Sequence, residues 1–400
     1  MDTFAQGIQI LKPPSTFPDE YLADPALPPE LSRDIRIALI DDGADFMHRA
    51  IKQILENGRS FDSVYDELEG PGVPSPFHGS TTGHGTLMTY MIGRVCPKVK
   101  IFVCKLDVIP GHGGTNSKAS FTAKSAADVS TWTLSSSLVS GTNLAHTQAV
   151  EFAVKRGFDI ISMSWTIQKS SDQDNDNTAD IARLEKAIKS AVDQKKLVFC
   201  SAPDIGTASR EMLESYYPFS CPGVSDSIFK IGAAKADGSI YGWSGELRNV
   251  DFILPGHKVD FKEGDKVDEK DDTPRTGSSV ATALAAGLAA LIIHCVRLGA
   301  IYNFHNGKGN DASVVNKSSV VAIKQFAAMR EAFLKISSFG GDKDKDRRIE
   351  VESFFDGPGK VLNAVYEKDD ARRKWEQITE ISRDLISSKA VAKAVPVARY

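Results

Sequence analysis

The feature that most constrains the fold is an apolar stretch at 276–295, TGSSVATALAAGLAALIIHC. It opens with small residues and two serines, and it has no polar side chain from Ala283 to Ile293. So many small apolar residues favour a helix over a strand, and a helix that is apolar on every side must be buried. The run falls short of the ~20 apolar residues that a membrane span needs. We therefore expect a helix at the centre of a protein core.

Ser278 and Ser279 stand where this helix begins. The first turn of a helix carries unpaired N–H groups and the positive end of the helix dipole, which both favour a developing negative charge. A nucleophilic serine would suit that position, although Gly-Ser-Ser before a helix is more commonly an ordinary N-cap. Partner residues elsewhere in the chain decide between the two interpretations.

Composition excludes several classes of function. The 400 residues are 42% hydrophobic and 25% charged with a net charge of -4, which is typical of a globular protein and predicts neither a nucleic-acid partner nor a membrane surface. No signal-peptide segment precedes residue 30, so we expect an intracellular, cytoplasmic location. The cysteines mostly occupy apolar runs, which favours buried thiols over a disulfide framework or a zinc site. They are Cys96, Cys104, Cys200, Cys221 and Cys295.

Strand patterns alternate with helix patterns across residues 35–300. The predicted strands are 35–40, 100–106, 159–165, 197–202, 228–233 and 250–254. The predicted helices are 86–95, 145–156, one that places Ile181, Leu184, Ile188 and Val192 on one face, and the apolar helix. This alternation predicts an α/β fold, with a doubly wound, mostly parallel sheet flanked by helices. Active sites in such sheets lie at the carboxyl ends of the strands.

Three regions follow from the pattern: a Pro-rich N-terminal extension at 1–34, an α/β domain at 35–300, and a mainly helical C-terminal extension at 301–400. We expect the N-terminal extension to be irregular. Its segment 7–18 either lies extended across the cleft at the carboxyl ends of the strands or forms a surface arm. In the C-terminal extension we expect amphipathic helices at 320–336 and 369–388, whereas the Gly/Ser/Thr-rich connection 109–145 is long enough for a lid or a disordered loop.

Asp41, His84 and Ser279 together suggest nucleophilic chemistry. Asp41 ends a predicted strand, and His84 stands in Gly-His-Gly-Thr at the start of a helix. Acyl transfer needs a hydroxyl nucleophile, an imidazole that accepts its proton, and a buried carboxylate that orients the imidazole. In isolation His84 would be a partly buried polar histidine and Asp41 a turn residue. His112 also stands in a Gly-His-Gly, but a Gly/Ser-rich loop follows it, which favours a loop residue.

These blocks resemble the subtilisin-like serine proteases, the subtilases. IALIDDGADFMH is similar to their aspartate block, GHGTLMT to their histidine block and TGSSVATALAAG to their serine block. IISMSW and FILPGHKV resemble the substrate-pairing strand and the Ala-Pro-Gly block, so the resemblance covers about 35–300. It implies a serine endopeptidase with protein or peptide substrates, an Asp41–His84–Ser279 triad, and Ser279 rather than Ser278 as the nucleophile. Asp42 stands where the family has Thr or Ser, and we expect it to be exposed.

The oxyanion position departs from the family. In place of the family's Ala-Ala-Gly-Asn-like block, the chain has Ser201-Ala202-Pro203-Asp204, so Asp204 replaces the asparagine donor. An ionised carboxylate only accepts hydrogen bonds, whereas a protonated one could donate. We therefore expect either a slow protease or one favoured at acidic pH.

The substrate-binding positions depart as well. By resemblance they are Ser162, Ser164, Trp165, Thr166, Ser201, Ala202 and Pro203. Thr166, Ile167 and Pro203 stand where the family has smaller residues, which predicts a narrow pocket. Such a pocket would take a small side chain before the scissile bond, or would bind no peptide well, rather than take a large aromatic side chain. A shifted alignment over a neutral loop is the alternative.

The resemblance requires no cofactor and predicts no catalytic metal. The acidic insertion 170–180, SSDQDNDNTAD, offers carboxylates that suit calcium, but it lacks EF-hand spacing and is more typical of a solvated loop. The oligomeric state stays open. Two alternative functions remain: a catalytically weak or inactive subtilase fold that serves as a binding or regulatory module, and a lipase-type hydrolase, which the lack of a Gly-x-Ser-x-Gly elbow disfavours.

Overall fold

The computed structural model describes most of the chain. Described are residues 2–12, 17–18, 20–61, 65–66, 70–71, 75–106, 108–109, 120–121, 149–169, 175–259, 275–337, 347–364 and 370–386. Most of the expected lid at 109–145, and residues 170–174 of the acidic insertion, lie outside these ranges.

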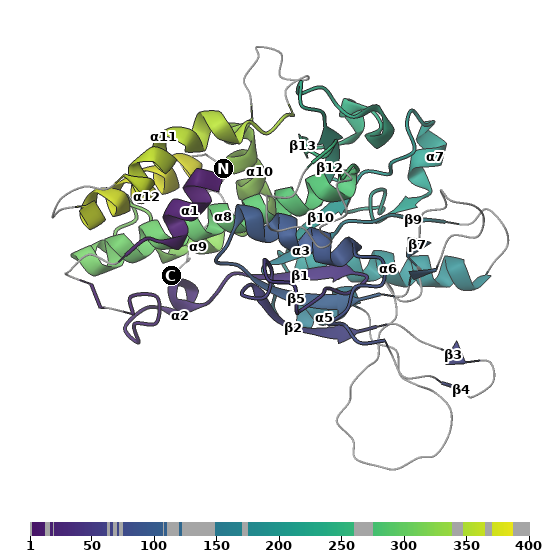
Figure 1. Ribbon diagram of the computed structural model, residues 1–400, viewed down its shortest axis with the longest axis horizontal. Coiled ribbons are helices and arrows are strands. Elements are labelled where there is room, and N and C mark those ends of the chain that lie inside the picture. Colours follow the sequence, from purple (N-terminus) through teal and green to yellow (C-terminus); the bar gives the residue numbers. More distant parts are fainter. Residues whose placement is uncertain are drawn as a thin grey trace, which may run out of the picture.

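A seven-stranded sheet forms the centre of the molecule, and all of its strand pairs are parallel (Figure 1). In spatial order the strands are β13 (Phe252–Pro255), β12 (Phe229–Ala234), β10 (Leu197–Ser201), β8 (Ile160–Met163), β1 (Arg36–Asp41), β5 (Lys100–Lys105) and β2 (Leu55–Ser60). The six predicted strands are confirmed. β2 was not predicted, because its sequence LENGRS is mostly polar and its residues are half-buried or exposed at the edge of the sheet.

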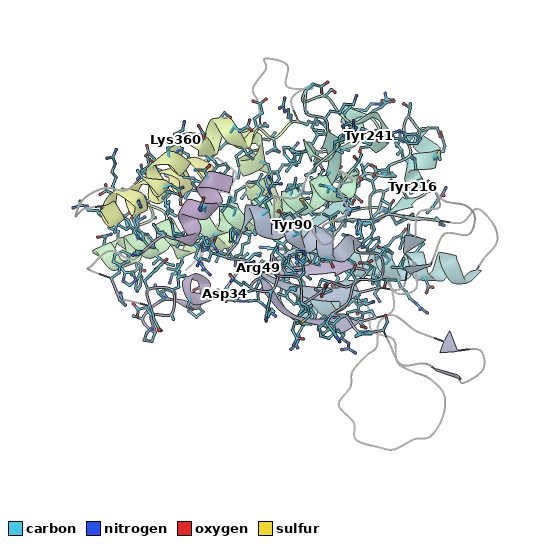
Figure 2. All side chains as sticks on the ribbon, in the orientation of Figure 1. Asp34, Arg49, Tyr90, Tyr216, Tyr241 and Lys360 are labelled. Atoms are coloured by element: carbon cyan, nitrogen blue, oxygen red, sulfur yellow. The ribbon has the colours of Figure 1, made fainter. Side chains whose placement is uncertain are left out.

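Helices cover both faces of this sheet, and side chains fill the space between the layers (Figure 2). Leu39 of β1 belongs to the hydrophobic cluster of α3 (His84–Val95) and α8 (Ser278–Asn303). Ile40, the next residue, points to the opposite face and joins the cluster of α5 (Ala149–Lys155) and α6 (Asn175–Asp193). Alternating side chains of a buried parallel strand thus supply both cores, as the predicted fold class requires.

α8 is the apolar helix that we expected, and it is almost wholly buried. By length and composition it is the one helix among the described residues that could cross a membrane, but 89% of its most apolar window lies inside the protein. It packs on the sheet, on α3 and on α12 (Asp370–Ile386). The helix continues to Asn303, so it crosses the expected domain boundary at residue 300.

The C-terminal helices pack onto this core. The predicted helix 320–336 is two helices, α9 (Lys317–Ile323) and α10 (Phe326–Ile336). α12 agrees with the predicted helix 369–388, whereas α11 (Val351–Asn363) was not predicted because it contains Pro358 between two glycines. Ser382 of α12 donates a hydrogen bond to the Cys295 carbonyl of α8 over 2.6 Å.

The expectation of an irregular N-terminal extension was wrong for its first residues, which form a helix. α1 (Asp2–Gln9) buries Phe4 against Phe355 of α11, with ring centroids 4.7 Å apart. Trp375 of α12 donates to the Lys12 carbonyl over 3.0 Å, and Phe17 also packs on the Trp375 ring. The described part of 7–18 therefore lies on the C-terminal helices and does not cross the cleft.

The remaining elements are short and lie outside the central sheet. They are α2 (Pro29–Ser32), β3 (Tyr65–Asp66), β4 (Gly70–Pro71), β6 (Val108–Ile109), β7 (Ser120–Phe121), β9 (Ile167–Gln168), α7 (Arg210–Glu214), β11 (Tyr216–Tyr217), η1 (Gly242–Ser244), η2 (Leu247–Asn249) and η3 (Phe304–Lys308). The five cysteines are all buried and free, as predicted from their apolar surroundings.

Close packing of α12 on α8 gives a first prediction. A Cβ atom at Gly299 of α8 would lie 2.8 Å from Ser382 Oγ, so Gly299→Val should force α12 away and lower the free energy of unfolding by about 1–3 kcal/mol. Chemical denaturation measures this change. Gly357→Ala in α11 is the control, because its Cβ would meet nothing and alanine favours a helix. Equal stability of the two variants would contradict the packing.

Candidate active site

Asp41 and His84 meet at the carboxyl end of the central strand. Asp41 is the last residue of β1, and His84 is the first residue of α3. His84 Nδ1 lies 2.8 Å from Asp41 Oδ1, which also accepts the Asp42 backbone N–H over 2.8 Å. Asp41 is fully buried, whereas the His84 side chain is 27% exposed. A buried carboxylate thus holds one ring nitrogen of the imidazole, and the same imidazole lines a cavity.

The two groups shift each other's protonation. Burial raises the pKa of Asp41, and the charge and hydrogen bond of His84 offset this only in part. For His84, burial acts to lower the pKa, but the negative charge of Asp41 and its hydrogen bond outweigh burial, with Asp42 adding a smaller effect, so the pKa is raised.

The two serines at the head of α8 have different environments. Ser278 is 2% exposed, and its hydroxyl donates to the Ala202 carbonyl over 2.5 Å. Ser279 is half-buried and lines the same cavity as His84. Gly277 before them has φ +153°, and a Cβ there would lie 3.2 Å from Ser279 Oγ. The glycine therefore keeps the space beside the Ser279 hydroxyl open.

This cavity has a volume of about 440 Å³ and collects most of the predicted site residues. Lining it are His84, Ser164, Trp165, Thr166, Ser201, Ala202, Asp204, Ser278 and Ser279. Ser162 is fully buried in β8 and Pro203 is buried, and neither lines the cavity. Thr82, Val108, Ile205 and Thr276 also line it, and none of them was predicted as a site residue. Thr82 and Ile205 adjoin predicted motifs or residues, and Thr276 is the first residue of the serine block.

Trp165 and Ser164 form a fixed part of the wall. Trp165 is 4% exposed, and its indole N–H donates to the Ile40 carbonyl of β1 over 2.6 Å. Ser164 Oγ is buried and has no hydrogen-bond partner among the described residues. The wall therefore combines a rigid apolar ring with a hydroxyl that a bound molecule could engage.

Asp204 points its carboxylate at the start of α8. Oδ1 and Oδ2 accept the Ser278 backbone N–H over 3.2 and 3.1 Å, and Oδ1 also accepts the Ser244 hydroxyl over 2.9 Å. Both oxygens therefore act as acceptors at the head of the helix. Ser244 was not predicted, since no motif in its sequence surroundings indicates a contact with residue 204.

The expectation that Asp42 is exposed was wrong. Its side chain is fully buried, and its carboxylate accepts hydrogen bonds from Ser80, Thr82 and Gly85. These donors come from one short segment about forty residues later in the chain, and the sequence alone does not show that this segment encloses Asp42.

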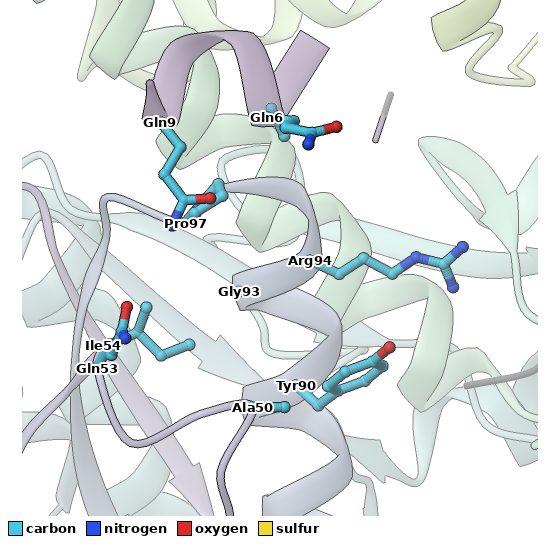
Figure 3. Close-up of a pocket in the computed structure, with 10 residues that line it drawn as sticks. Gln6, Gln9, Ala50, Gln53, Ile54, Tyr90, Gly93, Arg94 and Pro97 are labelled. Carbon is cyan, nitrogen blue, oxygen red and sulfur yellow. The ribbon is translucent and has the colours of Figure 1, made fainter. Parts of the chain in front are cut away.

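A second cavity of about 370 Å³ lies between α1 and α3 (Figure 3). Gln6 and Gln9 reach into it from α1, and Tyr90 and Arg94 line it from the second half of α3. None of its lining residues belongs to the cavity that contains His84. Across the described ranges, no group of three or more His, Cys, Asp and Glu residues could hold a metal ion. Residues 170–174 of the acidic insertion lie outside these ranges, and residues 175–180 form the first part of α6.

Comparison with known proteins identifies the family. The sequence profile of the subtilase family matches residues 32–297, which is most of the chain. The chain belongs to the subtilase family. A subtilase is a serine endopeptidase, so the family match identifies the class of enzyme. The profile ends within α8, and the helices after it lie beyond the match.

Two curated relatives align over much of this subtilase. An intracellular serine protease of Paenibacillus polymyxa is 26% identical over 270 residues, which are 65% of this chain and 67% of the relative. The major intracellular serine protease of Bacillus subtilis strain 168 is 22% identical over 296 residues, which are 72% and 74%.

Solved structures agree with the fold. A lanthipeptide protease has a TM-score of 0.51 at 19% identity and covers 79% of this subtilase and 85% of its own chain. The nisin leader peptidase NisP of Lactococcus lactis has a TM-score of 0.51 at 14% identity, with 88% and 90% covered. At these identities the likeness concerns the fold alone.

The titration of His84 tests the geometry without any substrate. In the intact subtilase we expect its pKa to lie above the ordinary 6.5. Asp41→Asn should lower that pKa, because burial then acts without the carboxylate charge. NMR of the imidazole ring protons against pH measures it, with His84→Gln to assign the signal. Asp237→Asn, on an exposed turn, is the control. A wild-type pKa at or below 6.5 would contradict the arrangement.

Proposed function

We propose that Asp41, His84 and Ser279 form the catalytic triad of this serine endopeptidase. The 2.8 Å contact between Asp41 and His84, beside a cavity that both His84 and Ser279 line, carries the proposal. Ser278 is an unsuitable nucleophile because its hydroxyl is buried and donates to Ala202. The substrate is a protein or peptide, as the family implies.

Each member has one task. Ser279 Oγ attacks the peptide carbonyl carbon, and His84 Nε2 takes the hydroxyl proton and then gives it to the leaving amine. Asp41 keeps the proton on Nδ1 and stabilises the imidazolium that forms. The backbone N–H of Ser279, at the positive end of α8, donates to the oxyanion.

Asp204 makes this enzyme slow. Its carboxylate accepts the Ser278 N–H at the head of α8 and the Ser244 hydroxyl of η1, and so offers no hydrogen bond to the oxyanion. Losing one such donor costs about 3 kcal/mol, or roughly 100- to 1000-fold in rate, a magnitude that itself comes from a subtilisin. Acidic pH would not restore the rate, because the raised pKa of His84 keeps its imidazole protonated there. We therefore favour slow hydrolysis at neutral or alkaline pH over an acidic optimum.

The specificity proposal rests on Thr166. Together with the Trp165 ring it lines the cavity, whereas Pro203 does not, so the narrowing predicted from Pro203 lacks support. We propose a small residue before the scissile bond. The cellular location is proposed to be cytoplasmic, because both curated relatives are named intracellular proteases.

A fluorophosphonate probe tests the triad. It should label the wild-type protein covalently, and Ser279→Ala should abolish labelling because the attacking oxygen is gone. Ser278→Ala is the matched control, since it removes a neighbouring hydroxyl from the same helix turn. The labelling rate should rise with pH through a midpoint above 6.5, as His84 loses its proton. Labelling that survives in Ser279→Ala would refute the assignment.

Asp204→Asn tests the missing oxyanion donor. An asparagine can accept the Ser278 N–H through its oxygen and donate through its nitrogen, so kcat should rise by about 10- to 1000-fold at neutral pH. Asp204→Ala is the control, because it removes the charge without adding a donor. Peptide hydrolysis under saturating substrate gives the measurement. An Asn variant no faster than wild type would count against the proposal.

A binding or regulatory module is the second candidate, and Asp204 is the observation that favours it. A subtilase fold without an oxyanion donor could still hold a peptide in the cavity. No labelling of the wild-type protein at any pH, combined with peptide binding measured by calorimetry, would support this function over catalysis.

A further inference from the structure

Asp42 lies directly beside the proposed triad and has an unusual set of contacts. Its Oδ1 accepts the Ser80 hydroxyl over 2.6 Å and the Gly85 backbone N–H over 2.8 Å. Its Oδ2 accepts both the backbone N–H and the hydroxyl of Thr82 over 2.6 Å each. All four donors come from 80–85, the segment that carries His84. The carboxylate is fully buried, so these donors replace its water.

The backbone reinforces this connection. The Thr81 N–H donates to the Asp42 carbonyl over 3.1 Å. Gly85 packs so closely on the turn after β1 that a Cβ there would collide with the Gly43 carbonyl oxygen and lie 2.9 Å from Asp42 Oδ1. The first turn of α3 is therefore seated directly on residues 42–43.

We propose that Asp42 is a positioning residue for the proposed triad: its buried carboxylate holds segment 80–85 against the end of β1 and so places His84 on Asp41. Asp42 touches neither the cavity nor the reacting atoms. It acts through His84, and this role rests on the proposed function for its kinetic consequence.

Four strong donors require a carboxylate at this position. The Thr or Ser that subtilases commonly have here offers one oxygen with two lone pairs, which cannot accept four hydrogen bonds. Asparagine would keep the two bonds at Oδ1 but would turn an NH₂ group toward the Thr82 N–H. The donor groups of segment 80–85 therefore suit a carboxylate at position 42.

The charge of Asp42 also acts on His84. Burial alone would raise the pKa of Asp42, but the hydrogen bonds from Ser80, Thr82 and Gly85 outweigh it and lower the pKa, so the group is ionised at neutral pH. Its negative charge helps to raise the pKa of His84. Titratable or charged side chains on the elements packed around Asp42 include Asp41 on β1, Asp45 and His48 on the turn after it, His78 on the loop, His84 on α3 and Lys105 on β5.

Lys105 does not cancel this charge through a direct ion pair in the described contacts. Its ammonium donates to the Gly79 carbonyl over 2.9 Å and to the Pro76 carbonyl over 3.4 Å. The lysine thus holds the beginning of the same loop through backbone oxygens, while Asp42 holds its end.

Asp42→Asn in the full chain tests the role, with Asp45→Asn as the matched control. Asp45 carries the same charge on the same turn, but its carboxylate binds Met47 rather than segment 80–85. The fluorophosphonate labelling rate of Asp42→Asn should fall by about 10- to 100-fold, because a small displacement of a catalytic group is costly. In the pH profile of this variant, the midpoint at which labelling is lost on the acidic side should move to lower pH, because His84 loses a neighbouring negative charge. Asp45→Asn should keep the wild-type rate.

Two further measurements separate the possible failures. The NMR titration of His84 needs no activity, so a lower His84 pKa in Asp42→Asn supports the role even if the wild-type protein does not label and the proposed function fails. An unchanged rate and an unchanged His84 titration would overturn it. If Asp42→Asn does not fold, Ser80→Ala removes one donor of the four and should show the same decrease on a smaller scale. A wild-type rate and titration in Ser80→Ala would then overturn the inference.

Discussion

Burial of α8 forces much of this architecture, because a helix that is apolar on every side needs protein on every side. The sheet covers one side, α3 another, and α12 most of what remains. This packing also fixes where the helix begins. Its first turn emerges at the carboxyl ends of the parallel strands, where Ser279 meets the cavity that His84 lines. The placement of the Ser279 hydroxyl is thus a consequence of core packing as well as of local sequence.

Three aspartates show how environment divides one chemical group among several tasks. Asp41 is buried with a single imidazole partner, and burial raises its pKa. Asp42, its chain neighbour, is buried among hydroxyl and backbone donors that lower its pKa. Asp204 accepts donors at the head of α8. The number and direction of the donors around each carboxylate decide its role, and residue type alone does not.

The sequence was a good guide where structure depends on local pattern. Six apolar runs predicted six buried strands, and the small-residue run predicted α8. It was a poor guide where contacts join distant segments: Asp42 was expected to be exposed, and this was wrong because its donors lie about forty positions later in the chain. Similarly, α1 finds its partner α11 near the other end of the chain. The motifs singled out His84 and Ser279, which line the cavity, and Asp41, which contacts His84, but Ser244 beside Asp204 had no such signal.

The contact between α12 and α8 couples the two ends of the molecule. One end of α8 carries Ser279 at the cavity, and α12 covers the other end. α11 packs on α12, and α1 packs on α11. Without the last helices, the apolar face of α8 that they cover would meet water. The C-terminal helices therefore support the same helix that carries Ser279. Their loss would expose apolar surface that favours aggregation and would also loosen the start of α8.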